Sequence, residues 1–100
     1  MRTYIVYILK CRDESFYTGM TSNLDLRLAE HRQGIDPRCY TFSRRPIHLV
    51  WSQPFPDETQ ALSRERQIKG WSRAKKKALI RGDWKGIGAA SKKAQAHSPR

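Results

Sequence analysis

Two short runs of β-branched and aromatic residues, joined by a polar turn, constrain the fold of this chain more than any other feature. The first run covers residues 3–11 (TYIVYILKC), and the second begins at Phe16 after the polar residues 12–15. Strand-forming runs separated by a few turn residues predict an antiparallel β-hairpin. Gly19 is expected to close the second strand.

A first helix is expected directly after this hairpin. Thr21 or Ser22 is placed to cap its N-terminus, because a side-chain oxygen there can accept a hydrogen bond from an unpaired backbone N–H. Leu24 and Leu28 follow at helical spacing and give the helix an apolar side. Gly34 is a natural C-terminal glycine, so the helix should stop near it.

Two later helices carry equally local signals. Asp57, with Gln60 three residues later, resembles a capping box that opens a second helix. Gly70 should terminate that helix, because glycine is favoured just after a helix end. Ser72 can then cap a third helix over residues 73–81.

The segment between the first and second helices combines a loop and a strand. Residues 35–45 contain Asp-Pro, a Tyr-Thr-Phe-Ser stretch and two adjacent arginines, which favours an irregular surface loop. Pro46 then opens a third strand over residues 47–52, and Pro54 belongs to the segment that ends it. One face of this strand is expected to look into the core and carries Ile47, Leu49 and Trp51.

Together these elements predict an α+β fold. A small three-stranded antiparallel sheet is flanked by three helices, in the order β-β-α-β-α-α. A chain of 100 residues has the size of one compact domain. We expect that domain to cover residues 1–82, and residues 83–100, rich in Gly, Ser, Ala and Lys, to form a basic, flexible tail.

The balance of charge predicts a polyanionic partner. The chain has 20 Lys and Arg against 9 Asp and Glu, a formal net charge of +11. Such a surplus attracts nucleic acid, so DNA is the expected partner and RNA is left open. No apolar run approaches the roughly 20 residues that span a bilayer, and no signal-peptide pattern follows Met1. We therefore expect a cytoplasmic protein without a membrane partner.

The cysteines and the late basic residues complete this expectation. Cys11 and Cys39 are far apart and lack a CxxC partner, so two free thiols are expected instead of a zinc knuckle or a disulfide scaffold. Basic side chains are expected to bind phosphates without reading sequence, although a merely solvated basic face is the alternative. The expected nucleic-acid-binding residues are Arg44, Arg45, Lys69, Arg73, Lys75, Lys76 and Lys77.

Four polar residues of the hairpin and the first helix are candidates for catalysis. In adjacent antiparallel strands Tyr7 and Tyr17 can point to the same face, which brings two phenols to one spot. On the helix, Arg27 and His31 lie along the stripe that also carries the packing leucines. Taken singly, each has a structural alternative, either a packing tyrosine or a solvated helix edge.

The spacing of these residues resembles that of a known nuclease family. Residues 6–8 (VYI), followed by residues 17–19 (YTG), look like the paired GIY and YIG tripeptides of the GIY-YIG nucleases. The family places an arginine, a histidine or tyrosine, and a metal-binding glutamate at the positions of Arg27, His31 and Glu65. The chain is most similar to small stand-alone bacterial members, related to the N-terminal nuclease domain found in the excision-repair excinuclease.

The resemblance covers about residues 3–81 and implies an endonuclease that hydrolyses phosphodiester bonds in structured or damaged DNA, as in DNA repair. Tyr17 would take a proton from the attacking water, and Tyr7 would help to position that water. Arg27 would clamp the scissile phosphate, and His31 would orient the water or accept a proton. One divalent ion, Mg²⁺ or Mn²⁺, would be held by a single carboxylate, with no small-molecule cofactor.

Two departures from the family pattern motivate an alternative. Met20 stands where several relatives carry a lysine, and no asparagine late in the domain matches the one that DNA-cutting relatives often have. The alternative is a non-catalytic, basic nucleic-acid-binding module on the same fold. Glu65 would then be an ordinary ion-pair partner of Lys69, four residues later on the helix. The oligomeric state is left open.

Overall fold

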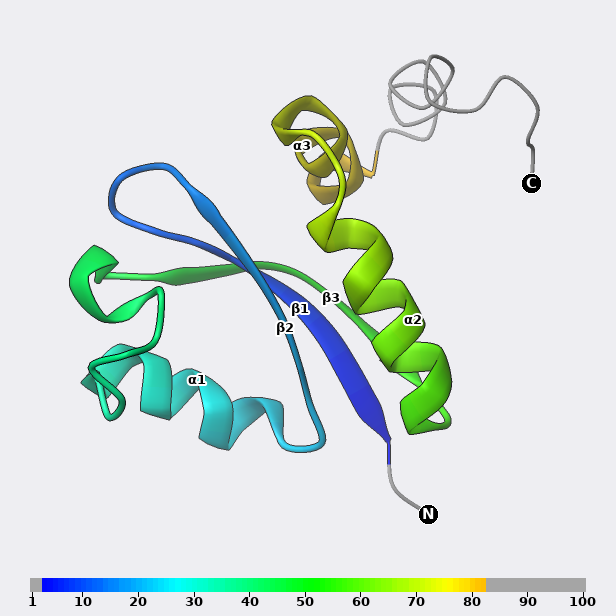
Figure 1. Ribbon diagram of the computed structural model, residues 1–100, viewed down its shortest axis with the longest axis horizontal. Helices are drawn as coiled ribbons and strands as arrows, with labels where there is room; N and C mark the ends of the chain where they lie inside the picture. The colour runs from blue at the N-terminus through cyan, green and yellow to red at the C-terminus, as the bar shows by residue number, and fades with distance from the viewer. Residues whose placement is uncertain (1–2, 83–100) are drawn as a thin grey trace. The chain divides into compact units, whose positions relative to one another are not determined.

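The computed structural model describes residues 3–82, in two compact units that divide between Lys69 and Gly70 (Figure 1). The first unit contains, in chain order, β1 (Tyr4–Lys10), β2 (Phe16–Thr21), α1 (Leu24–Gln33), the short 3₁₀ helix η1 (Phe42–Arg44), β3 (His48–Phe55) and α2 (Glu58–Lys69). The second unit contains α3 (Arg73–Arg81). The tail expected over residues 83–100 lies outside the described residues.

The three strands form one antiparallel sheet in the order β2-β1-β3, which confirms the predicted α+β fold with three helices. β1 and β2 make the predicted hairpin, in which Tyr7 lies opposite Gly19 and Leu9 lies opposite Tyr17. The second strand continues to Thr21. The prediction that Gly19 closes the strand is therefore wrong, because this glycine is paired inside it.

The third strand, β3, is longer than predicted, and its exposed residues differ. It stays paired with β1 along its length, and Pro54 lies inside it. An edge strand tolerates proline because the missing N–H can face away from the ladder. The register shifts between Ile8 and Leu9, which breaks the simple alternation. Leu49 therefore lies opposite Leu9 and Trp51 lies opposite Ile8, on the other face, so the prediction that Leu49 and Trp51 share one core-facing side is wrong. Leu49 is 36% exposed, whereas Ile47, just before the strand, is buried.

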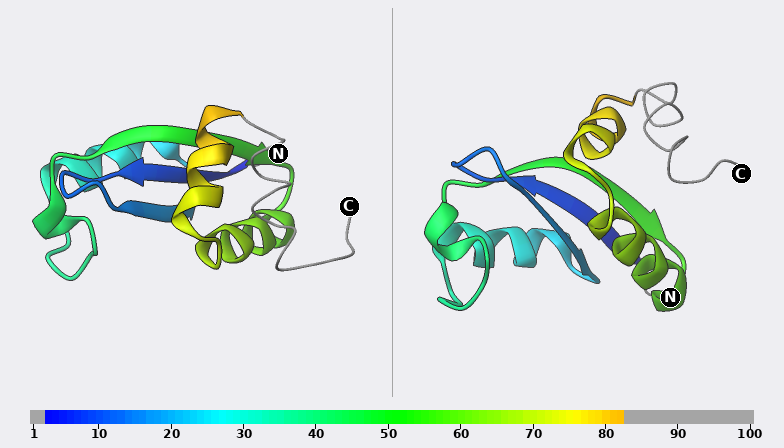
Figure 2. Two further views of the ribbon diagram at one scale, coloured as in Figure 1. Left: turned by 90° about the horizontal axis from the view of Figure 1, so that it is seen from above. Right: turned by 45° about the horizontal axis from the view of Figure 1, so that its top comes forward.

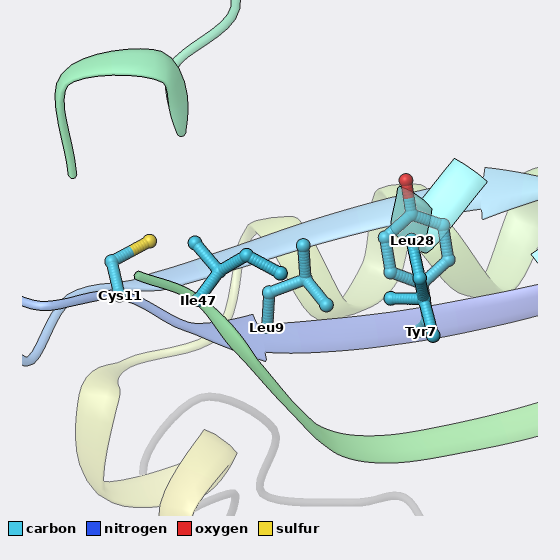
Figure 3. Packing of buried hydrophobic residues seen from close by; sticks show 5 residues of the cluster. All are labelled: Tyr7, Leu9, Cys11, Leu28 and Ile47. Atoms are coloured by element: carbon cyan, nitrogen blue, oxygen red, sulfur yellow. The ribbon is translucent and has the colours of Figure 1, made fainter. Parts of the chain in front are cut away.

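Helices α1 and α2 pack on the sheet from different sides, as the two further views also show (Figure 2). On the α1 side, Leu28 joins a buried cluster with alternate residues of β1 (Figure 3). The members of that cluster are Tyr7, Leu9, Cys11, Leu28 and Ile47. The intervening β1 residues Val6 and Ile8 are also fully buried, and α2 contributes the buried Ala61 and Ile68.

The first helix begins one residue later than the sequence suggested. Its N-cap is Asn23, whose side-chain oxygen accepts a hydrogen bond from the backbone N of Leu26 at 3.1 Å. The expectation of a cap at Thr21 or Ser22 is wrong, and Thr21 Oγ1 instead accepts from the backbone N of Asn23 at 3.0 Å. The predicted end is confirmed, since Gly34 is the C-cap with a left-handed φ of 71°.

The other two helices begin where predicted. The Asp57 carboxylate accepts hydrogen bonds from the backbone N and the side-chain Nε2 of Gln60, each at 2.8 Å, and α2 runs to Lys69. Ser72 Oγ accepts from the backbone N of Lys75 at 3.2 Å and caps α3. Within residues 3–82, no helix is long and apolar enough to cross a bilayer.

Candidate active site

The two tyrosines of the hairpin lie on the same face of the sheet. Because Tyr7 is opposite Gly19 and Tyr17 is opposite Leu9, the tyrosines are diagonal neighbours on adjacent strands. Their ring centroids are 6.4 Å apart, with the planes tilted by 44°. The hairpin register alone therefore brings two phenols to one spot.

Gly19 makes this arrangement sterically possible. A Cβ atom at this position would lie 2.6 Å from Cζ of Tyr7 and 3.1 Å from Cε2 of Tyr17. The first distance is shorter than real carbon contacts allow, so any larger residue would push the Tyr7 ring away. The glycine is thus required by the ring that covers it, not by a turn.

His31, on α1, faces these tyrosines from the helix layer. Its side chain is buried, with only 6% of the residue exposed, and Nε2 lies 3.1 Å from the Tyr7 hydroxyl. The imidazole centroid is 6.0 Å from the Tyr7 ring and 5.3 Å from the Tyr17 ring. A solvated helix edge, the structural alternative for this residue, is therefore ruled out by its burial.

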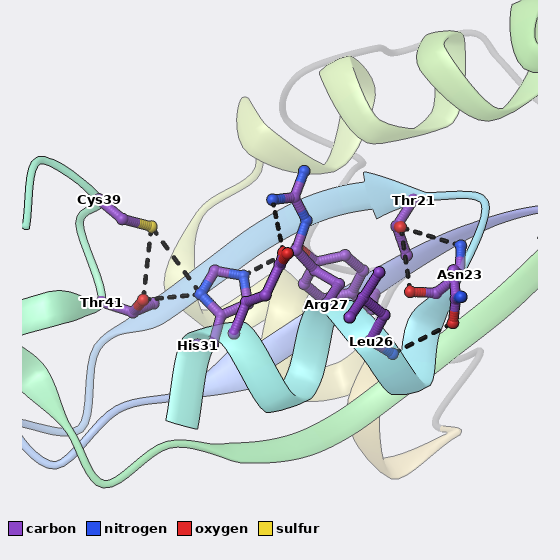
Figure 4. A network of polar contacts seen from close by, with 9 residues as sticks. Thr21, Asn23, Leu26, Arg27, His31, Cys39 and Thr41 are labelled. Carbon is purple, nitrogen blue, oxygen red and sulfur yellow. Dashed lines mark hydrogen bonds and ion pairs between the residues drawn. The ribbon is translucent and has the colours of Figure 1, made fainter. Parts of the chain in front are cut away.

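The other side of the His31 ring meets the loop before β3 (Figure 4). Thr41 Oγ1 lies 2.7 Å from His31 Nδ1, and Thr41 is only 1% exposed. Cys39 Sγ lies 3.4 Å from Thr41 Oγ1 and 3.8 Å from His31 Nδ1. The sequence predicted a surface loop here and missed both contacts, because nothing local marks a threonine that is buried by a distant helix.

A second loop residue, Tyr40, packs against the site and was also missed. Its ring stacks on Tyr17 at a centroid distance of 6.1 Å and an interplanar angle of 19°. The Arg44 guanidinium lies 3.8 Å from the centroid of the Tyr40 ring, and its Nε is 3.1 Å from Oδ2 of Asp13. The loop is thereby tied to the hairpin, and Tyr17 is held from the side.

Arg27 and Glu65 differ in exposure. The Arg27 side chain is 48% exposed, and its Nη1 lies 3.4 Å from Oε1 of Glu30. The Glu65 side chain on α2 is only 14% exposed, and its Oε2 lies 3.1 Å from Nζ of Lys69. The i, i+4 ion pair that the sequence offered as an alternative for Glu65 is therefore present in the structure.

Both phenols are neutral at physiological pH in this environment. Burial raises the pKa of Tyr7, with a further rise from Tyr17, and burial likewise raises the pKa of Tyr17. For both tyrosines, the Arg27 guanidinium lowers the pKa and the Glu65 carboxylate raises it. Residues from α1 and α2 therefore act electrostatically on the same two hydroxyls.

The His31 ring is also neutral at physiological pH. Burial is the main cause that lowers its pKa, and the positive charge of Arg27 lowers it further, while Glu30 acts in the opposite direction. A neutral imidazole carries one N–H and one lone pair. His31 can therefore donate at one ring nitrogen and accept at the other.

Two of the predicted phosphate-binding residues make contacts within their own loop. Arg44 Nη1 donates to the Tyr40 carbonyl at 2.9 Å, and Arg45 Nε donates to the Phe42 carbonyl at 2.8 Å. The Arg45 guanidinium also lies over the Phe42 ring, 4.9 Å from its centroid. These arginines hold the loop together, and their contact with nucleic acid stays a prediction.

The remaining predicted phosphate-binding residues, apart from Lys69, belong to the second unit. Arg73 and Lys77 are exposed, whereas Lys75 and Lys76 are half-buried. Lys75 Nζ lies 4.2 Å from the centroid of the Trp71 ring, and burial lowers the pKa of Lys76. The exposed Arg73 and Lys77 are thus the clearest candidates for phosphate contacts in this unit.

Glu65 suits one particular kind of metal ion. In the described part of the chain, no group of three or more His, Cys, Asp and Glu side chains is arranged to hold a metal. A closed structural zinc site needs four such ligands. Mg²⁺, by contrast, keeps several waters and is commonly bound by one or two carboxylates together with substrate phosphates. A single carboxylate that acts electrostatically on the two phenols fits that second mode.

Comparison with known proteins shows a consistent similarity over the described residues. Residues 3–78 match the family described as the GIY-YIG catalytic domain. A UPF0213 protein of Staphylococcus haemolyticus is 42% identical over 80 residues, which cover 80% of this chain and 96% of that protein. A UPF0213 protein of Natronomonas pharaonis is 44% identical over 77 residues, which cover 77% of this chain and 89% of that protein.

Two solution NMR structures share the fold. A UPF0213 protein of Bacillus halodurans is 36% identical, with a TM-score of 0.53, over 85% of this chain and 93% of that one. A protein of E. faecalis is 23% identical, with a TM-score of 0.58, over 100% of this chain and 96% of that one. The second likeness bears on the fold alone.

Proposed function

Because the chain belongs to the GIY-YIG catalytic domain family, a family of nucleases, we propose that it is a divalent-metal-dependent endonuclease that cuts phosphodiester bonds in structured or damaged DNA in the cytoplasm. The observation that carries this proposal is the buried hydrogen bond between Tyr7 and His31 beside Tyr17. A packing role accounts for a buried tyrosine, but a neutral histidine held against two phenols has the chemistry of a proton acceptor.

Arg27, the exposed cation of the site, is the residue that would bind the substrate. Arg27 is half-exposed, and its guanidinium can bind phosphate oxygens in a bidentate manner. Among residues 3–82, its head group makes one ion pair, the 3.4 Å contact with Glu30, and an exposed pair of this kind contributes little to stability. Arg27 is thus available to bind the scissile phosphate and to stabilise the charge that gathers on it.

The attacking water must lose a proton, and the hydrogen bond favours Tyr7 as its acceptor. The sequence favoured Tyr17 for this step. However, Tyr7 is the phenol that touches a neutral imidazole, so its oxygen can take a proton from water while its own proton moves to His31 Nε2. Because Tyr7 is only 1% exposed, its hydroxyl oxygen must become accessible to this water when the substrate binds. Tyr17, which is half-buried, then helps to hold that water.

Glu65 is the residue that would hold the metal ion. Mg²⁺ or Mn²⁺ bound there would supply positive charge to the phosphate and would offset the carboxylate charge that raises the pKa of both phenols. The Lys69 ammonium forms an ion pair with this carboxylate at 3.1 Å. Because the Lys69 side chain is 53% exposed, it can turn away toward solvent or toward a phosphate.

A plasmid and a branched duplex, incubated with Mg²⁺ or Mn²⁺, test this function. We expect metal-dependent nicking that Glu65→Gln abolishes, and that Tyr7→Phe lowers by about 10²- to 10⁴-fold, the usual contribution of acid–base catalysis. Glu58→Gln makes the same change as Glu65→Gln, but in the first turn of α2, and Tyr4→Phe makes the same change as Tyr7→Phe, but at the start of β1. Neither residue belongs to the proposed site, so the two variants are matched controls. Both controls should retain activity.

Binding measurements separate this function from the alternative, a non-catalytic nucleic-acid-binding module. An endonuclease should lose cleavage in Glu65→Gln while still binding DNA. If the purified chain binds DNA but cuts no substrate with either metal, the module is the correct description. If Glu58→Gln loses as much activity as Glu65→Gln, the role given to Glu65 is wrong.

A further inference from the structure

Thr41 lies behind the proposed catalytic histidine, and no sequence motif marks it. It belongs to the loop that leads into β3, ten residues after His31, and only 1% of it is exposed. Its Oγ1 is 2.7 Å from His31 Nδ1, the ring nitrogen that faces away from Tyr7. Because both groups are buried, this hydroxyl, and not water, is the hydrogen-bond partner of Nδ1.

The Tyr7 hydroxyl shows in which direction the chain of hydrogen bonds runs. Tyr7 is 1% exposed, and among residues 3–82 its hydroxyl has one hydrogen-bond partner, His31 Nε2. A buried O–H is almost always donated to an acceptor. The Tyr7 hydroxyl therefore donates to Nε2, which must present its lone pair.

The remaining protons then follow in order. Burial lowers the pKa of His31, so the ring is neutral and its single proton sits on Nδ1. That N–H donates to Thr41 Oγ1 at 2.7 Å. The Thr41 hydroxyl in turn can donate to Cys39 Sγ, 3.4 Å away. When each group donates to the next, from Tyr7 through His31 and Thr41 to Cys39, every donor in the chain has an acceptor.

We propose that Thr41 is a positioning residue that holds His31 in the Nδ1–H tautomer, so that the Nε2 lone pair faces the Tyr7 hydroxyl. With the opposite tautomer, Nε2–H would point at the Tyr7 oxygen. His31 could then take no proton from Tyr7, and the hydroxyl hydrogen would lose its acceptor. The part of this proposal that concerns rate rests on the proposed nuclease function, whereas the tautomer does not.

The tautomer can be measured without any substrate. Long-range ¹H–¹⁵N correlation spectra of the ¹⁵N-labelled full chain at neutral pH distinguish a protonated from an unprotonated imidazole nitrogen, and His31→Gln identifies the His31 signals. We expect Nδ1 of His31 to be protonated and Nε2 to be unprotonated. A protonated Nε2 in the wild-type protein overturns the proposal, whatever the nuclease assay shows.

Thr41 variants connect the tautomer to the reaction. Thr41→Val removes the hydroxyl and should give mixed tautomers and at least tenfold slower cleavage at saturating substrate, whereas Thr41→Ser should restore both. Thr18→Val is the matched control, because Thr18 is also a buried threonine (3% exposed) and its hydroxyl has no partner among the described residues. It should leave the His31 spectrum unchanged.

The outcomes are separable. A pure Nδ1–H tautomer in a folded Thr41→Val contradicts the proposal, as does a Thr41→Ser variant that behaves like Thr41→Val. If Thr41→Val does not fold, the wild-type spectrum and Thr41→Ser still decide the matter. A wild-type chain with the expected tautomer but no cleavage would refute the nuclease function and leave the positioning of His31 intact.

Discussion

At the scale of single residues, the site combines groups that are individually ordinary. A strand tyrosine, a helix histidine and a loop threonine become a chain of hydrogen bonds because all three are buried against one another. Removed from water, each donor and acceptor must be satisfied by a neighbour, which fixes rotamers and proton positions together. The same burial shifts the titration of His31, and this has a measurable effect on stability.

His31 should make the protein lose stability as the pH falls below about 6.5, the ordinary pKa of histidine. The lowered pKa means that the unfolded chain takes up a proton before the folded protein does. The free energy of unfolding therefore falls between pH 6.5 and the lower folded-state pKa, by at most about 1.4 kcal/mol per pH unit for one proton. Urea titrations from about pH 8 to pH 5 measure this slope.

Comparison with variants assigns the slope to its residue. His31→Gln should flatten it, whereas His48→Gln, which changes an exposed histidine, should leave it in place. The lowered pKa values of Asp13 and Asp36 affect stability only below their ordinary value of 3.8, outside this window. A slope that persists in His31→Gln would show that another group causes it and would contradict this prediction.

At the scale of secondary structure elements, helix α1 matters most, because it carries both Arg27 and His31 to the hairpin. Its start depends on one local contact, the hydrogen bond from the backbone N of Leu26 to the Asn23 side chain at 3.1 Å. The helix has only ten residues, so a cap is a substantial part of its stability.

Asn23→Ala should destabilise the protein by about 1 kcal/mol, the usual effect of losing an N-cap side chain. For a domain of this size, the change lowers the melting temperature by about 4–8 °C. Ser22→Ala is the control, because Ser22 is exposed and is not the cap. Thermal unfolding followed by circular dichroism measures both, and equal melting temperatures for the two variants would contradict the assigned cap.

The elements that the sequence predicted well are those with local signals. The hairpin, the Gly34 end of α1 and the caps at Asp57 and Ser72 depend on residues that are neighbours in the chain. The length of β3 could not be predicted in this way. Pro54 is compatible with the strand only because β3 is at the edge of the sheet, and an edge is a property of the whole topology.

The residues of the candidate site that were predicted are likewise those with local sequence signals. The diagonal pairing of Tyr7 and Tyr17 follows from the hairpin register, so the alternation of strand residues was enough to place them on one face. Thr41 and Tyr40 were missed because their contacts with His31 and Tyr17 bridge a loop and elements that precede it in the chain. A loop has no periodic pattern of apolar residues, so its sequence does not indicate which of its residues are buried.

At the scale of the whole molecule, the net charge of +11 is the dominant property. The second unit contributes Arg73 and the three consecutive lysines 75–77, while the first unit carries the tyrosines and His31. Each phosphate that a basic side chain neutralises releases counterions, so nucleic-acid affinity should fall steeply with salt. This behaviour is expected whether or not the chain cuts DNA.

Lys77→Gln should reduce the salt dependence of DNA binding. The slope of log K against log salt should become shallower by about one unit, the contribution of one phosphate contact. Fluorescence anisotropy with a labelled duplex in EDTA measures it without cleavage. Lys10→Gln removes the same charge from the hairpin, where Lys10 pairs with Glu14 at 2.9 Å, and should leave the slope unchanged. Equal slopes for all three proteins would argue against phosphate contact at Lys77.

The close approach of the Tyr7 ring to Gly19 gives a rule for judging other chains with these two tripeptides. The glycine of the second tripeptide and the tyrosine of the first are two halves of one packing unit, so they should be inherited or lost together. A chain that keeps both tyrosines but carries a bulkier residue at the glycine position has to hold its first phenol elsewhere. Such a chain can be rejected as a candidate nuclease from its sequence alone, before any protein is made.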